Sequence, residues 1–146
     1  EYVIQMKINV QRLDKSIDLP VFAHEGDAAM DLRSSEDKVL KSGQQSIVKT
    51  GIKVSIPEGC VGIIKDRSGL AAKNGLHCLA GVIDSGYRGE IGIVIRNLGN
   101  EDFHIEKNMR VAQMLVLRHE TPSLEEVDSL DDSLRSEKGF GSTGIK

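Results

Sequence analysis

The sequence predicts an all-β domain of the sandwich, jelly-roll or barrel type, and three observations lead to this prediction. Apolar and polar residues alternate over short stretches, which is the period of a half-buried strand. The apolar runs are rich in β-branched residues, which favour strands. Turn-forming residues separate these runs, among them many of the 15 glycines. Many short strands joined by turns are typical of sandwiches, jelly rolls and barrels.

The first expected strand covers residues 2–10, where every second residue is apolar. These apolar residues are Tyr2, Ile4, Met6, Ile8 and Val10. Because alternate side chains of a strand point to opposite faces, all of them would lie on one face. The second strand, residues 52–56, repeats the pattern before a turn at residues 57–59. Further strands are expected at residues 61–65, 91–96 and 111–117.

One short helix is expected at residues 68–75. Ser68 can cap its N-terminus, and Gly75 can end it. The acidic segment 124–134 carries apolar residues at near-helical spacing, and we assign it no structure.

Length and charge narrow the class of protein. A chain of 146 residues suits one domain, which we place at residues 1–134, followed by a flexible Gly-rich arm at residues 135–146. The net charge of −3 argues against broad nucleic-acid binding, which needs a basic face. The two cysteines, Cys60 and Cys78, have no metal ligand at the usual spacing and are expected to be free thiols.

Hydropathy gives no sign of a membrane protein. The longest apolar runs fall far short of the roughly 20 residues that a membrane helix needs. The N-terminus lacks a signal-peptide pattern. We therefore expect an intracellular protein, cytoplasmic or, in a eukaryote, also nuclear, with neither a membrane nor a nucleic-acid partner.

Residues 65–75 combine groups that suit phosphate recognition. Arg67 and Ser68 stand at the start of the expected helix, where backbone N–H groups favour an anion. A guanidinium and a hydroxyl add charge-assisted hydrogen bonds to phosphate oxygens. A surface arginine beside a serine cap explains the same residues, so both interpretations stay open.

Residues 79–92 contain an aspartate and a tyrosine around an expected tight turn at Ser85-Gly86. Asp84 precedes the turn, and an aspartate there usually caps its own backbone. Tyr87 follows the turn and lies outside any apolar run, so its ring is placed to stack against a planar or sugar-like ligand. Packing of Tyr87 in the core is the alternative.

Two more segments carry polar residues that could approach a site. Asp27 and Asp31 lie in the small-residue stretch 25–35, and the expected strand near the C-terminus brings Arg110 and Gln113 to one end of the sheet. A solvated charged rim explains these residues equally well.

The segment GFGSTG, residues 139–144, sets Phe140 among glycines near the end of the chain. Nothing around Phe140 in the sequence is able to bury its ring. A Gly-rich tail should stay mobile until something holds it, and we expect that a ligand does so.

Together these five segments resemble the five ordered motifs of the homotrimeric dUTPase family. In chain order they are DAAMDL (27–32), DRSGLAAK (66–73), GVIDSGYRGE (81–90), RVAQ (110–113) and RSEKGFGSTG (135–144). Each motif alone is unspecific, but five in order are very hard to obtain by chance. The resemblance covers nearly the whole chain.

The resemblance implies a distorted jelly-roll or β-clip subunit in a homotrimer with shared active sites. It implies Mg²⁺-dependent hydrolysis of dUTP to dUMP and pyrophosphate, which keeps uracil out of DNA and supplies dUMP for thymidylate synthesis. Two alternatives are a dCTP deaminase of the same fold and a non-catalytic trimer that senses nucleotide. The Asp84 to Tyr87 arrangement and the tail containing Phe140 speak against the deaminase.

The resemblance also implies roles for individual residues. Asp84 corresponds to the general base for the water that attacks the α-phosphorus, Tyr87 to the ring beneath deoxyribose, and Asp31 to the carboxylate that reaches Mg²⁺ through water. Phosphate-binding positions are Arg67, Ser68, Gly69 and Gln113. Uracil-reading positions are Gly81, Val82 and Ile83, in a splayed hairpin of about residues 77–87. The arm positions are Arg135, Phe140, Gly141, Ser142 and Thr143, with the ring of Phe140 over the uracil.

Some positions depart from the family pattern. Residues 136–138 (Ser-Glu-Lys) replace small residues in the arm, and Met30 stands where an aromatic residue is common. Asp66 stands where proline is frequent, so an additional carboxylate lies beside the expected phosphate site. His77 is expected to be a turn or surface residue and not a catalytic one.

Overall fold

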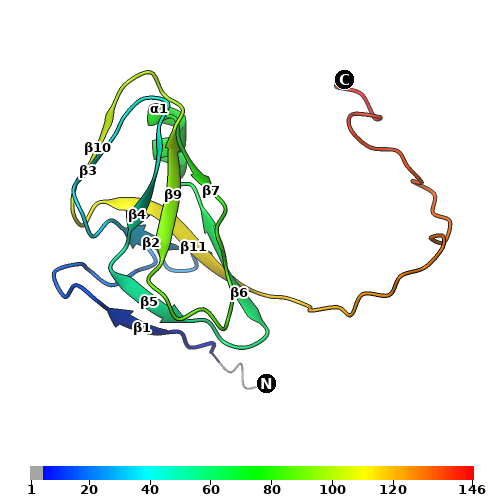
Figure 1. The fold of residues 1–146 in the computed structure, drawn as a ribbon, viewed down its shortest axis with the longest axis horizontal. Helices are drawn as coiled ribbons and strands as arrows, with labels where there is room; N and C mark the ends of the chain where they lie inside the picture. The colour runs from blue at the N-terminus through cyan, green and yellow to red at the C-terminus, as the bar shows by residue number, and fades with distance from the viewer. Residues whose placement is uncertain (1–4) are drawn as a thin grey trace.

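The computed structural model describes residues 5–146, and strands dominate it (Figure 1). Eleven strands and one helix lie within these residues. They are β1 (Asn9–Arg12), β2 (Met30–Arg33), β3 (Lys38–Leu40), β4 (Gln45–Lys49), β5 (Ile52–Ser55), β6 (Cys60–Lys65), α1 (Ser68–Asn74), β7 (Leu76–Leu79), β8 (Val82–Ile83), β9 (Gly92–Asn97), β10 (Phe103–Ile105) and β11 (Arg110–Arg118). The prediction of an all-β fold with one short helix is confirmed.

The strands pair antiparallel and form two main sheets. One sheet has the strand order β2-β11-β6-β8 and the other β4-β9-β7, while β1 pairs with β5 and β3 with β10. Apolar side chains from both main sheets meet in one core cluster, as in a sandwich or jelly roll. Members that are almost fully buried include Leu32, Val48, Ile93, Ile95 and Met114.

Four of the five expected strands are confirmed, with bounds that differ by at most one residue at either end. They correspond to β5, β6, β9 and β11. The remaining strands carry too short a run of alternating residues to be recognised from the sequence. β8, for example, has two residues and β10 has three.

The first expected strand is wrong for residues 5–8, which form no strand, and residues 2–4 lie outside the described residues. β1 begins at Asn9, which faces Ser55 of β5. Two residues further along the same ladder the partner would be Pro57, which has no N–H to donate. The alternation is nevertheless real, because one face packs against the core through Met6, Ile8 and Val10.

The helix α1 lies where it was expected, but its cap is shifted by one residue. Arg67 is the N-cap and makes no side-chain capping bond, so the expectation that Ser68 caps the helix is wrong. Gly75 ends the helix as predicted. Its φ of 70° is left-handed, and its N–H donates to the carbonyl of Ala71.

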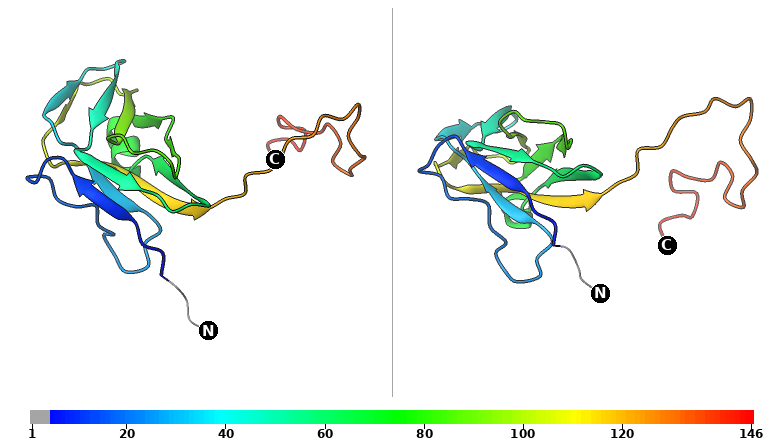
Figure 2. Two further views of the ribbon diagram at one scale, coloured as in Figure 1. Left: turned by 60° about the horizontal axis from the view of Figure 1, so that its bottom comes forward. Right: turned by 90° about the horizontal axis from the view of Figure 1, so that it is seen from below.

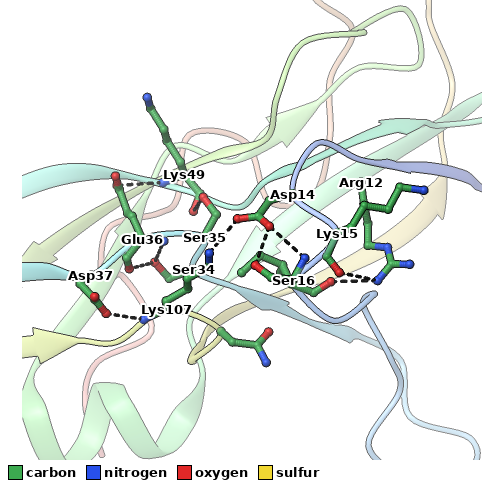
Figure 3. A network of polar contacts seen from close by, with 12 residues as sticks. Arg12, Asp14, Lys15, Ser16, Ser34, Ser35, Glu36, Asp37, Lys49 and Lys107 are labelled. Atoms are coloured by element: carbon green, nitrogen blue, oxygen red, sulfur yellow. Dashed lines mark hydrogen bonds and ion pairs between the residues drawn. The ribbon is translucent and has the colours of Figure 1, made fainter.

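A network of polar contacts holds the loop after β1 against neighbouring loops (Figure 3). The hydroxyl and the backbone N–H of Ser16 donate to Asp14 at 2.5 and 2.9 Å, and Nζ of Lys107 lies 3.0 Å from the same carboxylate. These contacts lower the pKa of Asp14 to about 2. The backbone N–H of Lys107 donates in turn to Asp37 at 2.8 Å. The network therefore joins the loops before β2, β3 and β11.

The chain after β11 leaves the body of the molecule as an extended segment, which both views of Figure 2 show. Residues 119–138 and 140–146 are exposed, and Phe140 is fully exposed. The last strand thus ends at Arg118, and the boundary at residue 135 between domain and arm stays a prediction. Within residues 5–146, no helix is long and apolar enough to cross a membrane.

Candidate functional site

A cavity of about 810 Å³, here called the main cavity, opens where β2, β6 and β11 meet the start of α1. Both basic and acidic side chains line it. The basic residues are Lys65, Arg67 and Lys73, and the acidic residues are Asp27, Asp31 and Asp66. Ser68, Gly69 and Gln113 also line it. The predicted phosphate-binding residues and Asp31 therefore do lie together.

Strand register explains why these distant parts of the sequence meet. β11 lies between β2 and β6, and Gln113 is the Cα partner of Asp31 on one side and of Lys65 on the other. Side chains of a strand alternate between faces, so a shift of one residue would turn Gln113 to the opposite face. The register of β11 thus sets the composition of the main cavity.

Asp31 is buried, with 8% of its surface exposed, and it lies between two arginines. Nε of Arg67 is 3.3 Å from one carboxylate oxygen, and Nη1 of Arg110 is 3.5 Å from the other. An unpaired buried carboxylate would cost several kcal/mol, and the two arginines offset that cost. The same contact orients the guanidinium of Arg67, which lines the cavity.

Two further hydrogen bonds connect β11 to the segment that follows β6. Nε2 of Gln113 donates to the backbone carbonyl of Asp66 at 2.7 Å. Nη1 of Arg67 donates to the backbone carbonyl of Arg110 at 3.2 Å. The side chains of Gln113 and Arg67 are thereby held in place before any ligand binds, which lowers the entropic cost of binding.

The carboxylate of Asp66 has contacts that its position in the sequence did not suggest. One oxygen accepts the backbone N–H of Cys78 at 2.5 Å, and the other lies 2.7 Å from Nδ1 of His77. Burial opposes ionisation of Asp66, but the bonds to His77 and Cys78 outweigh it and hold its pKa below the ordinary value. Burial and the neighbouring Asp66 carboxylate raise the pKa of Cys78 to about 12, so this thiol stays protonated.

The turn at residues 84–90 is held by its own hydrogen bonds. The backbone N–H of Tyr87 donates to the carbonyl of Asp84 at 3.1 Å, which confirms the predicted tight turn. The hydroxyl of Tyr87 donates to the carbonyl of Glu90 at 2.8 Å, and Nη1 of Arg88 donates to the carbonyl of Ser85 at 2.6 Å. A Cβ at Gly89 would lie 2.6 Å from the Tyr87 ring, so a larger residue there would displace the ring.

The two predicted functional side chains of this turn face outward. Tyr87 is 44% exposed, so the alternative that it packs in the core is wrong for this chain. The turn bond is accepted by the backbone of Asp84 and not by its carboxylate. Among the described residues that line the main cavity, neither Asp84 nor Tyr87 is present.

The two strands of the predicted base-reading hairpin, β7 and β8, belong to different sheets. β7 pairs with β9, whereas β8 pairs with β6. Between them Gly81 has a φ of 116°, and its carbonyl accepts the N–H of Ile64 at 2.9 Å. A side chain at this position would meet Ile64 at 3.0 Å, so the turn needs glycine. Val82 is exposed and Ile83 packs against the core.

The arm residues are not brought to the main cavity. Arg135 bonds locally, through Nε to the carbonyl of Lys138 at 2.8 Å. A turn over residues 139–142 follows, with the N–H of Ser142 donating to the carbonyl of Gly139 at 3.1 Å. Phe140, Gly141, Ser142 and Thr143 are exposed. In the described chain, the arm therefore lies apart from the other predicted site residues.

The dUTPase family model matches residues 15–144, which is most of the chain. The chain belongs to the dUTPase family. The match includes all five motif segments and so confirms the resemblance that they indicated.

Curated dUTPase relatives align over nearly their full length. The deoxyuridine 5'-triphosphate nucleotidohydrolase of Alkaliphilus metalliredigens is 48% identical over 141 residues, with 95% of this chain and 98% of that protein covered. The enzyme of the same name from Clostridium novyi is 46% identical over 142 residues, with 96% and 100% covered.

Solved dUTPase structures share the fold. The Staphylococcus bacteriophage 80alpha dUTPase with dUPNHPP has a TM-score of 0.91 and 33% identity, and the alignment covers 97% of this chain and 100% of that one. A dUTPase variant from phage phi11 of S. aureus, which coordinates a structural Mg(II) ion, has a TM-score of 0.79 and 29% identity over 85% of this chain and 98% of its own.

The carboxylates of this dUTPase chain are its candidate ligands for Mg²⁺. No cluster of three or more His, Cys, Asp or Glu side chains able to hold a metal lies within residues 5–146. Three carboxylates, Asp27, Asp31 and Asp66, line the main cavity, and that of Asp66 is already bonded to His77 and Cys78. Mg²⁺ commonly binds through one or two carboxylates, several waters and substrate phosphates. The donor set fits an ion that arrives with a polyphosphate.

Two basic residues that line the dUTPase cavity were not predicted as site residues from the sequence. Lys65 ends β6, and Lys73 lies in the last turn of α1. A lysine at the end of a strand or helix is common on any surface, so the sequence contained no signal that separated these two from other lysines.

Proposed function

We propose that this chain is a dUTP diphosphatase, which hydrolyses dUTP to dUMP and pyrophosphate with Mg²⁺. The observation that carries the proposal is the main cavity, which Arg67, Ser68, Gly69 and Gln113 line together with Asp31. Membership of the dUTPase family and the names of the relatives support dUTP as the substrate. The basic residues of the cavity suit a polyphosphate.

Asp84 is the proposed general base. Its carboxylate takes a proton from a water molecule, the oxygen of that water forms a bond to the α-phosphorus, and the bond from that phosphorus to the bridging oxygen breaks. Pyrophosphate leaves with the electron pair of the broken bond. Arg67 and the hydroxyl of Ser68 bind the phosphate oxygens, and Mg²⁺, when bound, neutralises part of their charge. Asp31 would hold that ion through water.

The nucleoside is proposed to bind at the 77–87 hairpin. Uracil presents acceptor, donor and acceptor along its pairing edge, and the backbone of Gly81, Val82 and Ile83 offers the complement. Cytosine presents an amine where uracil has a carbonyl, so a buried polar group would be left unpaired. The ring of Tyr87 lies beneath the deoxyribose and leaves no room for a 2′-hydroxyl.

A complete site is proposed to need more than one copy of the chain. Asp84 and Tyr87 do not line the main cavity of their own chain, and Tyr87 is exposed in a locally held turn. A homotrimer with head-to-tail contacts would bring this turn of one copy to the main cavity of the next. The arm, with Arg135, Phe140 and residues 141–143, would then close over the nucleotide.

The test is a pyrophosphate-release assay over deoxy and ribo nucleoside triphosphates, with and without Mg²⁺. We expect turnover of dUTP with Mg²⁺ and about 10⁴-fold lower kcat/KM for dCTP, the range that hydrogen-bonded recognition of a substrate allows. Release of ammonia from dCTP would instead support the deaminase. Nucleotide binding without turnover of any substrate would support a sensing trimer.

A further inference from the structure

Asp66 connects the segment that follows β6 to β7, the first strand of the predicted base-reading hairpin. Its carboxylate binds the backbone N–H of Cys78 and the ring of His77, both in β7. Its backbone carbonyl accepts a hydrogen bond from Gln113 at 2.7 Å. The residue itself lines the main cavity and directly precedes Arg67.

The sheet topology makes this contact necessary for β7. β6 is hydrogen-bonded to β8 and, one residue on, to Gly81, but it forms no ladder with β7. β7 is the edge strand of the other main sheet, bonded to β9 alone among the described strands. The N–H of Cys78 is satisfied by a side chain in place of a neighbouring strand. The Asp66 carboxylate therefore spans the gap between the two sheets.

The carboxylate is suited to this task because it stays charged. Its bonds to His77 and Cys78 outweigh the effect of partial burial and hold its pKa below the ordinary value. A hydrogen bond to a charged acceptor is shorter and stronger than a neutral one. Charged neighbours of the contact are Lys65 in β6 and Arg96, the cross-strand partner of His77 in β9.

We propose that Asp66 is a positioning residue that holds β7, and with it the base-reading turn, in place against the segment that follows β6. The proposal rests on the proposed function. Selectivity for uracil depends on the alignment of backbone groups at Gly81–Ile83, which follow Cys78 by three to five residues. The chemistry at the α-phosphorus depends on Asp84, which lies beyond the pairing of β8 with β6 in a turn held by its own hydrogen bonds. Loosening β7 therefore affects base selectivity more than turnover.

The main test compares Asp66→Ala with Asp66→Asn, whose amide oxygen can still accept the N–H of Cys78. We expect Asp66→Ala to lower the ratio of kcat/KM for dUTP over dCTP about tenfold or more, the scale of losing one aligned polar contact. The loss should appear mainly in KM for dUTP, with kcat within about threefold of wild type. Asp66→Asn should recover most of the selectivity.

The matched control is Asp37→Ala, which removes another carboxylate that accepts a backbone N–H, from Lys107, in the network of Figure 3. It should leave selectivity unchanged. Thermal melting shows whether the Asp66→Ala variant is folded. A folded variant with wild-type selectivity overturns the proposal. Equal selectivity losses in the Asn and Ala variants also overturn it, because the N–H acceptor would then be irrelevant.

A second measurement does not depend on turnover. The rate of iodoacetamide alkylation at Cys78 should rise in Asp66→Ala, because both the loose strand and the lost negative charge favour the reactive thiolate. Cys60, which is 2% exposed, is the internal reference. If wild type hydrolyses no dUTP but Cys78 becomes reactive in the variant, the proposed function fails while the tie between Asp66 and β7 stands. An unchanged alkylation rate overturns the tie itself.

Discussion

The main cavity and the 84–90 turn are organised in opposite ways. In the cavity, side chains from β2, β11 and the segment after β6 bind one another, as Asp31 does with Arg67 and Arg110. In the turn, the hydrogen bonds span three residues or fewer, and Tyr87 faces outward. The cavity is completed by contacts between distant segments, whereas the turn is rigid but has no described counterpart in its own chain.

This difference indicates which part of the proposed site needs a second copy of the chain. A ring held in a fixed place at the surface loses little conformational entropy when a ligand or partner covers it. Charged groups that are already paired in a cavity need no partner chain to stay in position. We therefore expect the turn to be the half of the site that another copy of the chain completes.

The largest effect is expected from a substitution in the 84–90 turn that leaves the main cavity unchanged. Asp84→Asn should lower kcat for dUTP by at least about 10²-fold, as expected when a general base is lost. Pyrophosphate release under saturating dUTP measures this, and KM should change little because the amide keeps the size of the carboxylate. The control is Asp102→Asn, a surface aspartate that accepts the N–H of Ser42. An Asp84→Asn rate equal to wild type would refute the assignment.

Removal of the arm should have the next largest effect. Deletion of residues 135–146 should lower kcat/KM for dUTP by about tenfold or more, because groups that position the nucleotide are lost. The melting temperature should stay close to that of wild type, since this segment is exposed and bonded only locally among the described residues. A large fall in melting temperature would mean that the arm is structural.

The smallest effect is a partial recovery that tests whether the two regions come from different chains. Asp84→Asn and Arg67→Gln are each expected to be inactive as pure proteins. Subunits mixed at equal amounts, unfolded together and refolded should regain about a quarter of wild-type activity, because random head-to-tail trimers pair an intact turn with an intact cavity at one interface in four. Each variant refolded alone serves as the control. No recovery would mean that each site belongs to one chain.

Part of the fold followed from local pattern. Alternation over residues 61–65 and 111–117 predicted β6 and β11, and Gly75 predicted the end of α1. Short strands such as β8 could not be predicted, because two residues carry no period. The start of the first strand could not be predicted either, since it depends on where Pro57 falls opposite it.

The sequence by itself determined the family, because five short motifs in order mark it, and each motif is a local property of the chain. It did not determine that Asp31 would lie between Arg67 and Arg110, or that Asp66 would reach across to β7. Those contacts follow from the register of β11 and from the separation of β7 and β8 into two sheets. Only packing decides such distances, because the energy that sets them comes from burying distant segments against one another.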